Sequence, residues 1–411
     1  MGRYRRTGSV RRPALRPASA LPSGPVAKYY LYKLTATAGL TVPVWVLFLR
    51  AQHLSYTEIM LLDAIWWVGL TAGEIPTGYV GDRMGWRNSL VVGNALRAAA
   101  VVAMGLVSTF AAFAGVYLLW ALGSTLMSGS TDAWLYETLE RRGDADAFAH
   151  CRGRGQSLTL AAGAAAAVLG GYLGTVSFRL PFLVTGVLWA GGAVVLATMP
   201  AVAVADDDRL TVLEALPVLR ERLLSVELRG VVLWVAVVLA VANATGRLTQ
   251  PVAVDLGVPS AWLGWLYAGF TVFAAVASDR SAWLRDRFGF DGWLLLGPAV
   301  LGGLLAAVWF APVVALPAFV LVRVVRTPTE TLANEYINDR VATAGRATTL
   351  SGVSMVNAVV AIPFGVALGA AADLSPSLAL AGIGAVLLAL VGVVALGGLV
   401  TTDAPEPRPT D

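Results

Sequence analysis

The sequence is poor in the residues on which most enzyme and metal sites depend. It has one cysteine, Cys151, and two histidines, His53 and His150. An intrachain disulfide is therefore excluded, and a His/Cys metal site is not expected. Lysine occurs only twice and no Walker-type phosphate loop is present, which argues against ATP as a direct energy source. Because no nucleophile or metal constellation emerges, we expect neither an enzyme nor a bound cofactor.

Charge is scarce as well. Charged residues make up 14% of the chain, hydrophobic residues 57%, and the mean hydropathy is +0.70. The charges lie in short clusters between apolar runs of about 20 residues, the length that crosses a bilayer as a helix. The net charge of +4 does not indicate a nucleic-acid partner, because the arginines fall mainly in alternate loops. These features predict an all-α, polytopic membrane protein.

Apolar runs bounded by charges and turn residues predict twelve transmembrane helices. Their approximate limits are 29–51, 57–79, 89–109, 112–136, 157–177, 180–200, 230–250, 260–283, 291–311, 313–335, 349–371 and 377–400. Arginines concentrate in the loops that follow an even number of spans. The positive-inside rule then places both termini in the cytoplasm, for a multi-pass protein of the cell (plasma) membrane.

The longest connection divides the chain into two halves. We expect a disordered cytoplasmic arm at 1–27, six-helix halves at 28–200 and 229–401, a linker with an amphipathic helix at 201–228, and a disordered tail at 402–411. A shift of 204 residues superposes Asp82, Arg83 and Gly85 on Asp286, Arg287 and Gly289. This favours a duplication into two six-helix pseudo-repeats with a substrate site between them.

The stretch GYVGDRMGWRNSL, residues 78–90, resembles the loop signature G-x-L-A-D-R-x-G-R-R-x-x-L of the major facilitator superfamily. It stands between spans 2 and 3, as in that family. The resemblance implies a gate that latches one orientation of the transporter and releases in the other, formed here by Gly78, Asp82, Arg83, Gly85 and Arg87. The sequence departs at Trp86, where the signature has a cation, and we expect this indole at the membrane interface. The alternative for Asp82 and Arg83 is that they lie in an ordinary solvated loop.

Three further stretches resemble a drug-efflux-like prokaryotic subgroup of the superfamily. They are Glu74-Ile75-Pro76-Thr77-Gly78, the segment DAWLYETLE in span 4, and Arg346 to Ser351. This resemblance supports a transport function better than it supports a drug as the transported substrate.

Ionisable residues inside the spans are the candidate substrate or proton sites, because each costs about 2.5–3.5 kcal/mol at mid-bilayer. Asp63 and Glu74 share one stripe of span 2, since eleven residues make about three helical turns. Either could carry a proton. In the alternative, Asp63 lies in water at the outer end and Glu74 accepts hydrogen bonds from a helix start.

Span 10 is the most polar. Arg323, Arg326 and Glu330 follow one face, where Arg326 and Glu330 can pair and Arg323 is left for an anion. The alternative is a structural network. Asp132 is either a cavity group or an interface carboxylate. We expect Arg247 at the membrane interface and the remaining candidates at a cavity, with snorkelling as the alternative for Lys33 and pairing with a carboxylate as the alternative for Arg97. They are Lys33, Arg97, Ser128 and Asn243.

These observations predict a secondary active transporter that moves a small organic solute by alternating access. Export with proton exchange (an antiporter) is the leading expectation, with the solute, protons and the bilayer as partners and a monomeric state. Trp120 stands where many proton-driven exporters carry an arginine, and Ala166-Ala167 replace the Gly-Pro of the antiporter pattern. Uniport and symport therefore stay open. The alternatives are uptake or facilitated transport of an organic anion, and a receptor or scaffold that does not transport.

Overall fold

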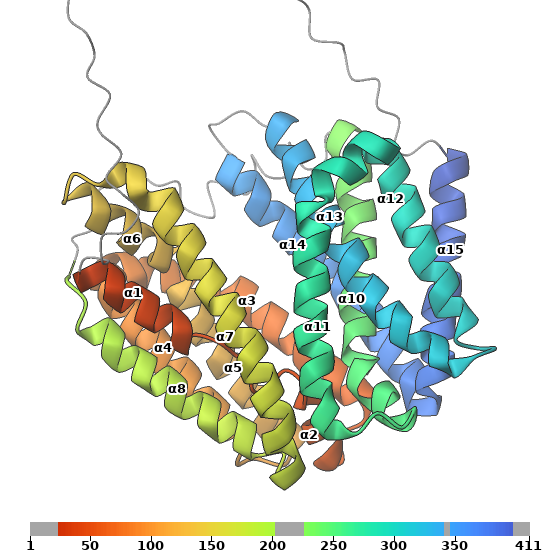
Figure 1. Ribbon diagram of the computed structural model, residues 1–411, viewed down its shortest axis with the longest axis horizontal. Coiled ribbons are helices and arrows are strands. Elements are labelled where there is room, and N and C mark those ends of the chain that lie inside the picture. Colours follow the sequence, from red (N-terminus) through yellow and green to blue (C-terminus); the bar gives the residue numbers. More distant parts are fainter. Residues whose placement is uncertain (1–23, 202–225, 341–345, 398–411) are drawn as a thin grey trace, which may run out of the picture.

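The computed structural model describes residues 24–201, 226–340 and 346–397 (Figure 1). Within these ranges the chain forms helices and no strand. The predicted amphipathic helix of the linker lies outside the described residues, as do the C-terminal tail and most of the N-terminal arm. The first helix begins at Gly24, inside the segment expected to be an arm.

The helices gather in two bundles (Figure 1). The N-terminal bundle contains α1 (Gly24–Thr35), α2 (Trp45–Ala51), α3 (Tyr56–Met84), α4 (Trp86–Met104), α5 (Phe110–Met127), α6 (Ser130–Glu140), α7 (Phe148–Val176) and α8 (Leu180–Ala197). The C-terminal bundle contains α10 (Val226–Asp255), α11 (Ser260–Asp279), α12 (Ser281–Ala307), α13 (Ala315–Arg340), α14 (Arg346–Leu374) and α15 (Pro376–Gly397).

Each predicted span overlaps one helix or a pair of helices. The prediction of twelve unbroken helices is wrong, because the first and fourth spans are each divided into two helices. Residues 36–44 separate α1 from α2, and Ser128 and Gly129 separate α5 from α6. In the described part of the chain, nine segments are long and apolar enough to cross a membrane.

Two glycines of the gate motif and its second copy share one backbone conformation. Gly85 has φ 78° and ψ 155°, and Gly289 has φ 71° and ψ 168°. Glycine adopts this region without the steric cost of a Cβ. The positions that the 204-residue shift superposes are therefore also alike in local structure.

The bundles touch mainly at one end, where α3 begins and α14 ends, which we call the closed end. There α7 packs on α11 and α3 on α14. A Cβ on Gly264 would lie 2.3 Å from the carbonyl oxygen of Ala167, so only glycine permits this backbone contact. Asp373 at the end of α14 accepts hydrogen bonds from the backbone N–H groups of Tyr56 and Thr57, at 2.6 and 3.1 Å, and so caps α3. Towards the opposite, open end, the bundles diverge (Figure 1).

A buried apolar cluster fills the N-terminal bundle near its open end. It contains Tyr29, Tyr32, Leu90, Trp134 and also Trp86, which is 8% exposed. The expected anchoring of the Trp86 indole at the interface is therefore wrong. Because α4 begins at this residue, its ring turns into the bundle and adds apolar contact where the family signature has a cation.

Candidate functional site

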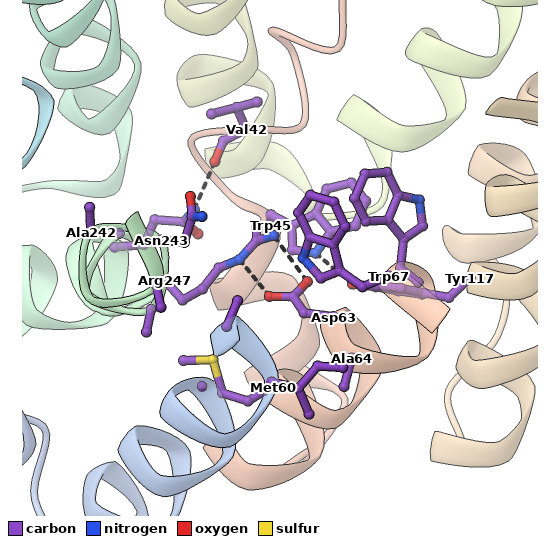
Figure 2. Close-up of a pocket in the computed structure, with 18 of the residues that line it drawn as sticks. Val42, Trp45, Met60, Asp63, Ala64, Trp67, Tyr117, Ala242, Asn243 and Arg247 are labelled. Carbon is purple, nitrogen blue, oxygen red and sulfur yellow. Dashed lines mark hydrogen bonds and ion pairs between the residues drawn. The ribbon is translucent and has the colours of Figure 1, made fainter. Parts of the chain in front are cut away.

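A central cavity of about 290 Å³ lies between the bundles (Figure 2). Polar and aromatic side chains from both bundles line it, among them Trp45, Asp63, Trp66, Trp67, Tyr117, Trp120, Asn243, Arg247, Gln250, Tyr267, Arg323 and Arg326. Small residues of α10 and α14 complete the wall and leave the space open. The cavity is thus shared by segments far apart in the sequence.

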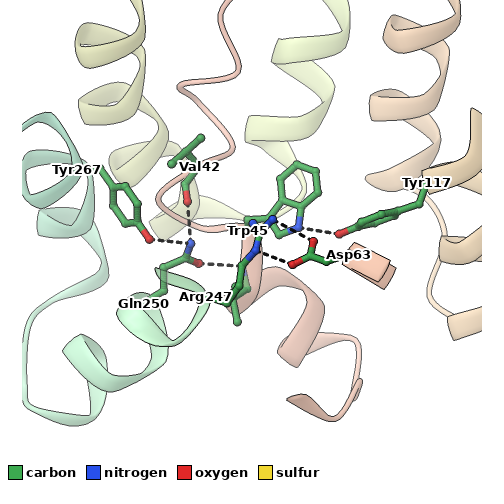
Figure 3. A network of polar contacts seen from close by, with 8 residues as sticks. Val42, Trp45, Asp63, Tyr117, Arg247, Gln250 and Tyr267 are labelled. Carbon is green, nitrogen blue, oxygen red and sulfur yellow. Dashed lines mark hydrogen bonds and ion pairs between the residues drawn. The ribbon is translucent and has the colours of Figure 1, made fainter. Parts of the chain in front are cut away.

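An ion pair across this cavity joins the two bundles. Asp63 on α3 accepts a hydrogen bond from Nη2 of Arg247 on α10 at 3.0 Å, and its other carboxylate oxygen lies 2.6 Å from Nε of the same arginine (Figures 2 and 3). This two-point geometry is the strong form of an arginine–carboxylate contact. The Asp63 side chain is only 20% exposed, so it does not lie in water at the outer end. Interfacial placement of Arg247 is likewise wrong, because its charge is held inside by Asp63.

Gln250, one turn further along α10, completes the contact between the bundles (Figure 3). Its Oε1 accepts hydrogen bonds from the N–H groups of Val46 and Leu47, at 2.8 and 3.3 Å, and its Nε2 donates to the carbonyl of Val42 at 2.7 Å. The break in the first span leaves these backbone groups without helical partners. A side chain of one bundle therefore caps a broken helix of the other.

Aromatic side chains of the N-terminal bundle form one wall. Trp45 and Trp120 have ring centroids 5.3 Å apart, and Trp66 and Trp120 lie 5.6 Å apart. Nε1 of Trp45 donates to the hydroxyl of Tyr117 at 2.8 Å. The indole N–H groups of Trp66 and Trp120 are buried and have no hydrogen-bond partner. This wall thus offers aromatic faces together with two unused donors.

Arginines of α13 form the opposite wall. Arg323 lines the cavity with its guanidinium carbon 5.7 Å from the ring centroid of Phe270. No carboxylate of the described residues lies within ion-pair distance of it. Arg326 lies 3.8 Å from Glu330, the pairing that the spacing of four allows. Asn243 also lines this cavity.

A second cavity, of about 430 Å³, lies nearer the open end. Glu74, Arg97 and Ser128 line it, and Trp67 lines both cavities. The expected pairing of Arg97 with a carboxylate of span 2 or span 4 is wrong. Its guanidinium instead stacks 4.2 Å from the ring of Trp189, because α8 places that ring against α4.

The next two predicted residues line neither cavity. Lys33 has its Nζ 5.9 Å from the Tyr29 ring centroid and lines neither cavity. Asp132 pairs with Arg152 at 2.8 Å, and both side chains are more than two-fifths exposed, so this is a surface ion pair of small energetic weight. Among residues 24–201, 226–340 and 346–397, no three His, Cys, Asp or Glu side chains come together as a metal-binding group.

The gate motif lies at the open end. Gly78 and Asp82 fall in the last turns of α3, and Arg87 in the first turn of α4 donates to Asn88 Oδ1 at 3.2 and 3.0 Å. Arg83 is exposed, and the side chain of Asp82 lies outside the described part. The latch function of these residues stays a prediction.

Sequence reasoning did not single out Trp66 as part of a ligand-binding surface. Trp66 lies about 60° from Asp63 on the side away from Trp67 and Glu74, so it falls outside the stripe that these residues share. The signal that could have found it is the pair of adjacent tryptophans inside a span beside an acid.

Comparison with known sequences places the chain in a family. A model described as the Major Facilitator Superfamily matches residues 34–365. The chain is also 24% identical, over 256 residues, to the uncharacterized MFS-type transporter YxaM of Bacillus subtilis (strain 168). That alignment covers 58% of this chain and 62% of the relative, so the chain spans less than two thirds of that protein.

Solved structures share the fold. The nucleoside transporter NupG has a TM-score of 0.72 at 12% identity, covering 92% of this chain and 98% of its own. A bacterial homolog of the human lysosomal transporter Spinster, in an inward-facing and unoccupied conformation, has 0.67 at 17%, covering 92% and 96%. A D-xylose-proton symporter has 0.66 at 15%, covering 90% and 96%. Because the family model spans more than half of the chain, the protein belongs to the major facilitator superfamily.

Proposed function

We propose that the protein is a secondary transporter for a small organic anion with an aromatic or other planar apolar part. One observation carries this proposal: the central cavity holds hydrogen-bond donors that have no acceptors. Two buried indole N–H groups, of Trp66 and Trp120, are unpaired. Arg323 has no carboxylate partner among the described residues, and the nearby Asp63 is already occupied by Arg247. Buried donors are costly without acceptors, and an anionic ligand in this cavity would supply acceptors.

The charge of the cavity favours an anion over a cation. Its lining contains the three arginines 247, 323 and 326 and the single carboxylate Asp63, with Glu330 beside Arg326. A positive surplus in a site of low dielectric attracts an anion and repels a cation. The tryptophan faces supply stacking surface for a planar group. A volume of about 290 Å³ suits a ligand with one ring.

The arrangement supports transport by alternating access between two six-helix repeats. The closed end is sealed by Asp373, Gln250 and the Gly264 contact, while the bundles diverge at the open end. If the positive-inside rule holds for this chain, the open end faces the cytoplasm with both termini. The described state is then inward-facing, and opening it outwards requires these contacts to separate.

For coupling we propose proton symport. Arg247 is engaged by Asp63, so a proton on Asp63 would free a further cation for the anionic substrate. Proton and anion would bind together and therefore move in the same direction. This disfavours the expected antiport, in which the two ligands must alternate, and leaves the direction of net transport to the gradients.

The test is flux into proteoliposomes with a pH-sensitive dye inside. Three aromatic probes differ in charge: benzenesulfonate, benzyltrimethylammonium and phenyl glucoside. We expect flux of benzenesulfonate, at least tenfold lower in Arg323→Gln and unchanged in Arg280→Gln, whose arginine is exposed beside Asp279. Flux of the cation alone would refute the anion proposal. Folded protein that transports none of the three would support the receptor or scaffold alternative.

A further inference from the structure

The second cavity contains a break in a membrane-spanning segment. Helix α5 ends at Met127, and α6 begins at Ser130 after Gly129, which has φ 70° and ψ −26°. The first N–H with a helical acceptor is that of Ala133, which donates to the Gly129 carbonyl at 3.1 Å. The N–H groups before it have no acceptor within the helix. Gly129 has no side chain to cap them.

Such a break is tolerated inside a membrane only where it is buried in protein or lines a cavity. Here it lines one: Ser128 and Thr131, on either side of Gly129, both belong to the wall of the second cavity. A helix N-terminus carries about half a positive charge from the aligned peptide dipoles. The end of α6 at this cavity is thus suited to a negative group, as in transporters with discontinuous helices.

Arg97 adds an independent indication. It lines the same cavity from α4, and its Nε is enclosed without a hydrogen-bond partner. Nη1 lies 3.5 Å from the sulfur of Met127, a weak acceptor. No carboxylate of the described residues lies within ion-pair distance. The Trp189 ring offsets part of the cost of burying this guanidinium, and an acceptor that entered from the cavity would offset more of it.

The acids near this site do not neutralise it. Asp132, in the first turn of α6, is engaged by Arg152 at 2.8 Å. Glu74 lines the cavity from α3 and forms no ion pair with Arg97. Its negative charge shares the space that an anion would enter and therefore weakens anion binding.

We propose that the α5–α6 break and Arg97 form a second binding site, for the oxyanion group of a carboxylate, sulfonate or phosphate solute. This site lies on the open-end side of the central cavity. Its lining residues on α3 and α14, such as Glu74 and Ser354, come about two to three turns nearer that end than Asp63 and Ile362 of the central cavity. Trp67 forms the partition, so a solute could pass from one site to the other along its ring.

The experiment is calorimetric titration of the purified protein, in an uncharged detergent, with benzenesulfonate. We expect two sites in the wild type. Arg97→Gln removes one of them, with at least a tenfold loss of affinity, and Arg97→Lys restores most of it because the charge remains. Glu74→Gln tightens the same site several-fold. An Arg97→Gln isotherm equal to that of the wild type overturns the proposal.

The variants also separate this site from the central one. Arg323→Gln should remove binding at the central cavity and leave the Arg97 site intact. Loss of the Arg97 site alone and loss of the central site alone are therefore different results, so either proposal can fail while the other stands. Each variant must elute as one species with the wild-type melting temperature. If Arg97→Gln does not fold, Glu74→Gln decides: unchanged or weaker affinity overturns the proposal, because a carboxylate remote from a bound anion would have no such effect.

Discussion

The ion pair between Asp63 and Arg247 should control which end of the transporter is open. Its two partners belong to different bundles and meet near the closed end. When that end opens, the bundles separate and the pair breaks. Asp63→Asn keeps the shape of the side chain and removes its charge, so we expect this variant to populate the state in which the closed end has opened.

The magnitude follows from the geometry. Truncating one partner of a buried, hydrogen-bonded charge pair costs about 2–5 kcal/mol. The Arg247 side chain is 42% exposed, so solvent screens part of the interaction and the low end, about 2 kcal/mol, applies. This corresponds to roughly a 30-fold change in the equilibrium constant. A minor state populated at about 1% would rise to about a quarter of the molecules.

The assay is a distance measurement between spin labels at the closed end. Val176, at the end of α7, and Leu374, at the end of α14, are 77% and 81% exposed and lie on different bundles. The single native cysteine, Cys151, is buried and is replaced by serine. The parent protein should give one short distance. Asp63→Asn should add a longer one that accounts for about a quarter of the molecules.

Two controls bound the interpretation. Asp279→Asn makes the same chemical change at an exposed aspartate of the C-terminal bundle and should leave the distances unchanged. The double variant Asp63→Asn/Arg247→Gln leaves no unpaired charge, so it should shift the equilibrium less than Asp63→Asn alone. A single short distance in Asp63→Asn would refute the reasoning, since the pair would then contribute nothing to keeping this end shut.

Three further outcomes are expected. Gly264→Ala places a Cβ 2.3 Å from the Ala167 carbonyl oxygen, so the same labels should report more opening, and an unchanged distance would contradict the packing. Gln250→Leu leaves the broken first span uncapped, at a cost of about 1–3 kcal/mol. The melting temperature should fall by several degrees, whereas leucine in place of an exposed glutamine should leave the melting temperature unchanged. Gly289→Ala should cost about 1–3 kcal/mol because of its positive φ, whereas Gly303→Ala, with open space at its Cβ, should be near neutral; equal melting temperatures would refute the strain.

Local sequence was sufficient for the helical framework. A run of about 20 apolar residues must form hydrogen bonds within itself to lie in a bilayer, so hydropathy alone locates the helices. Helical periodicity likewise predicted that Asp63 and Glu74 lie on one stripe, and they line the two cavities joined by Trp67. The turn at Gly85 was readable because only glycine adopts its conformation without cost.

The breaks in the first and fourth spans were not readable. Apolar residues continue across residues 36–44, and the groups that stabilise this first break come from elsewhere. Gln250, which caps α2, is more than 200 residues away in the sequence. A helix can be broken where a distant side chain forms hydrogen bonds with the backbone groups that lose their helical partners. Whether such a side chain is present depends on tertiary contacts.

The sequence by itself determined which charges enter the membrane, because those residues lie inside apolar runs whatever the packing. Only the tertiary structure decided which of them are paired. Asp63 meets Arg247 across 184 positions, whereas Arg97 meets the ring of Trp189 in place of an acid. The physical reason is that Coulomb energy depends on distance in space and on solvent exposure, and both are set only when the two bundles pack together.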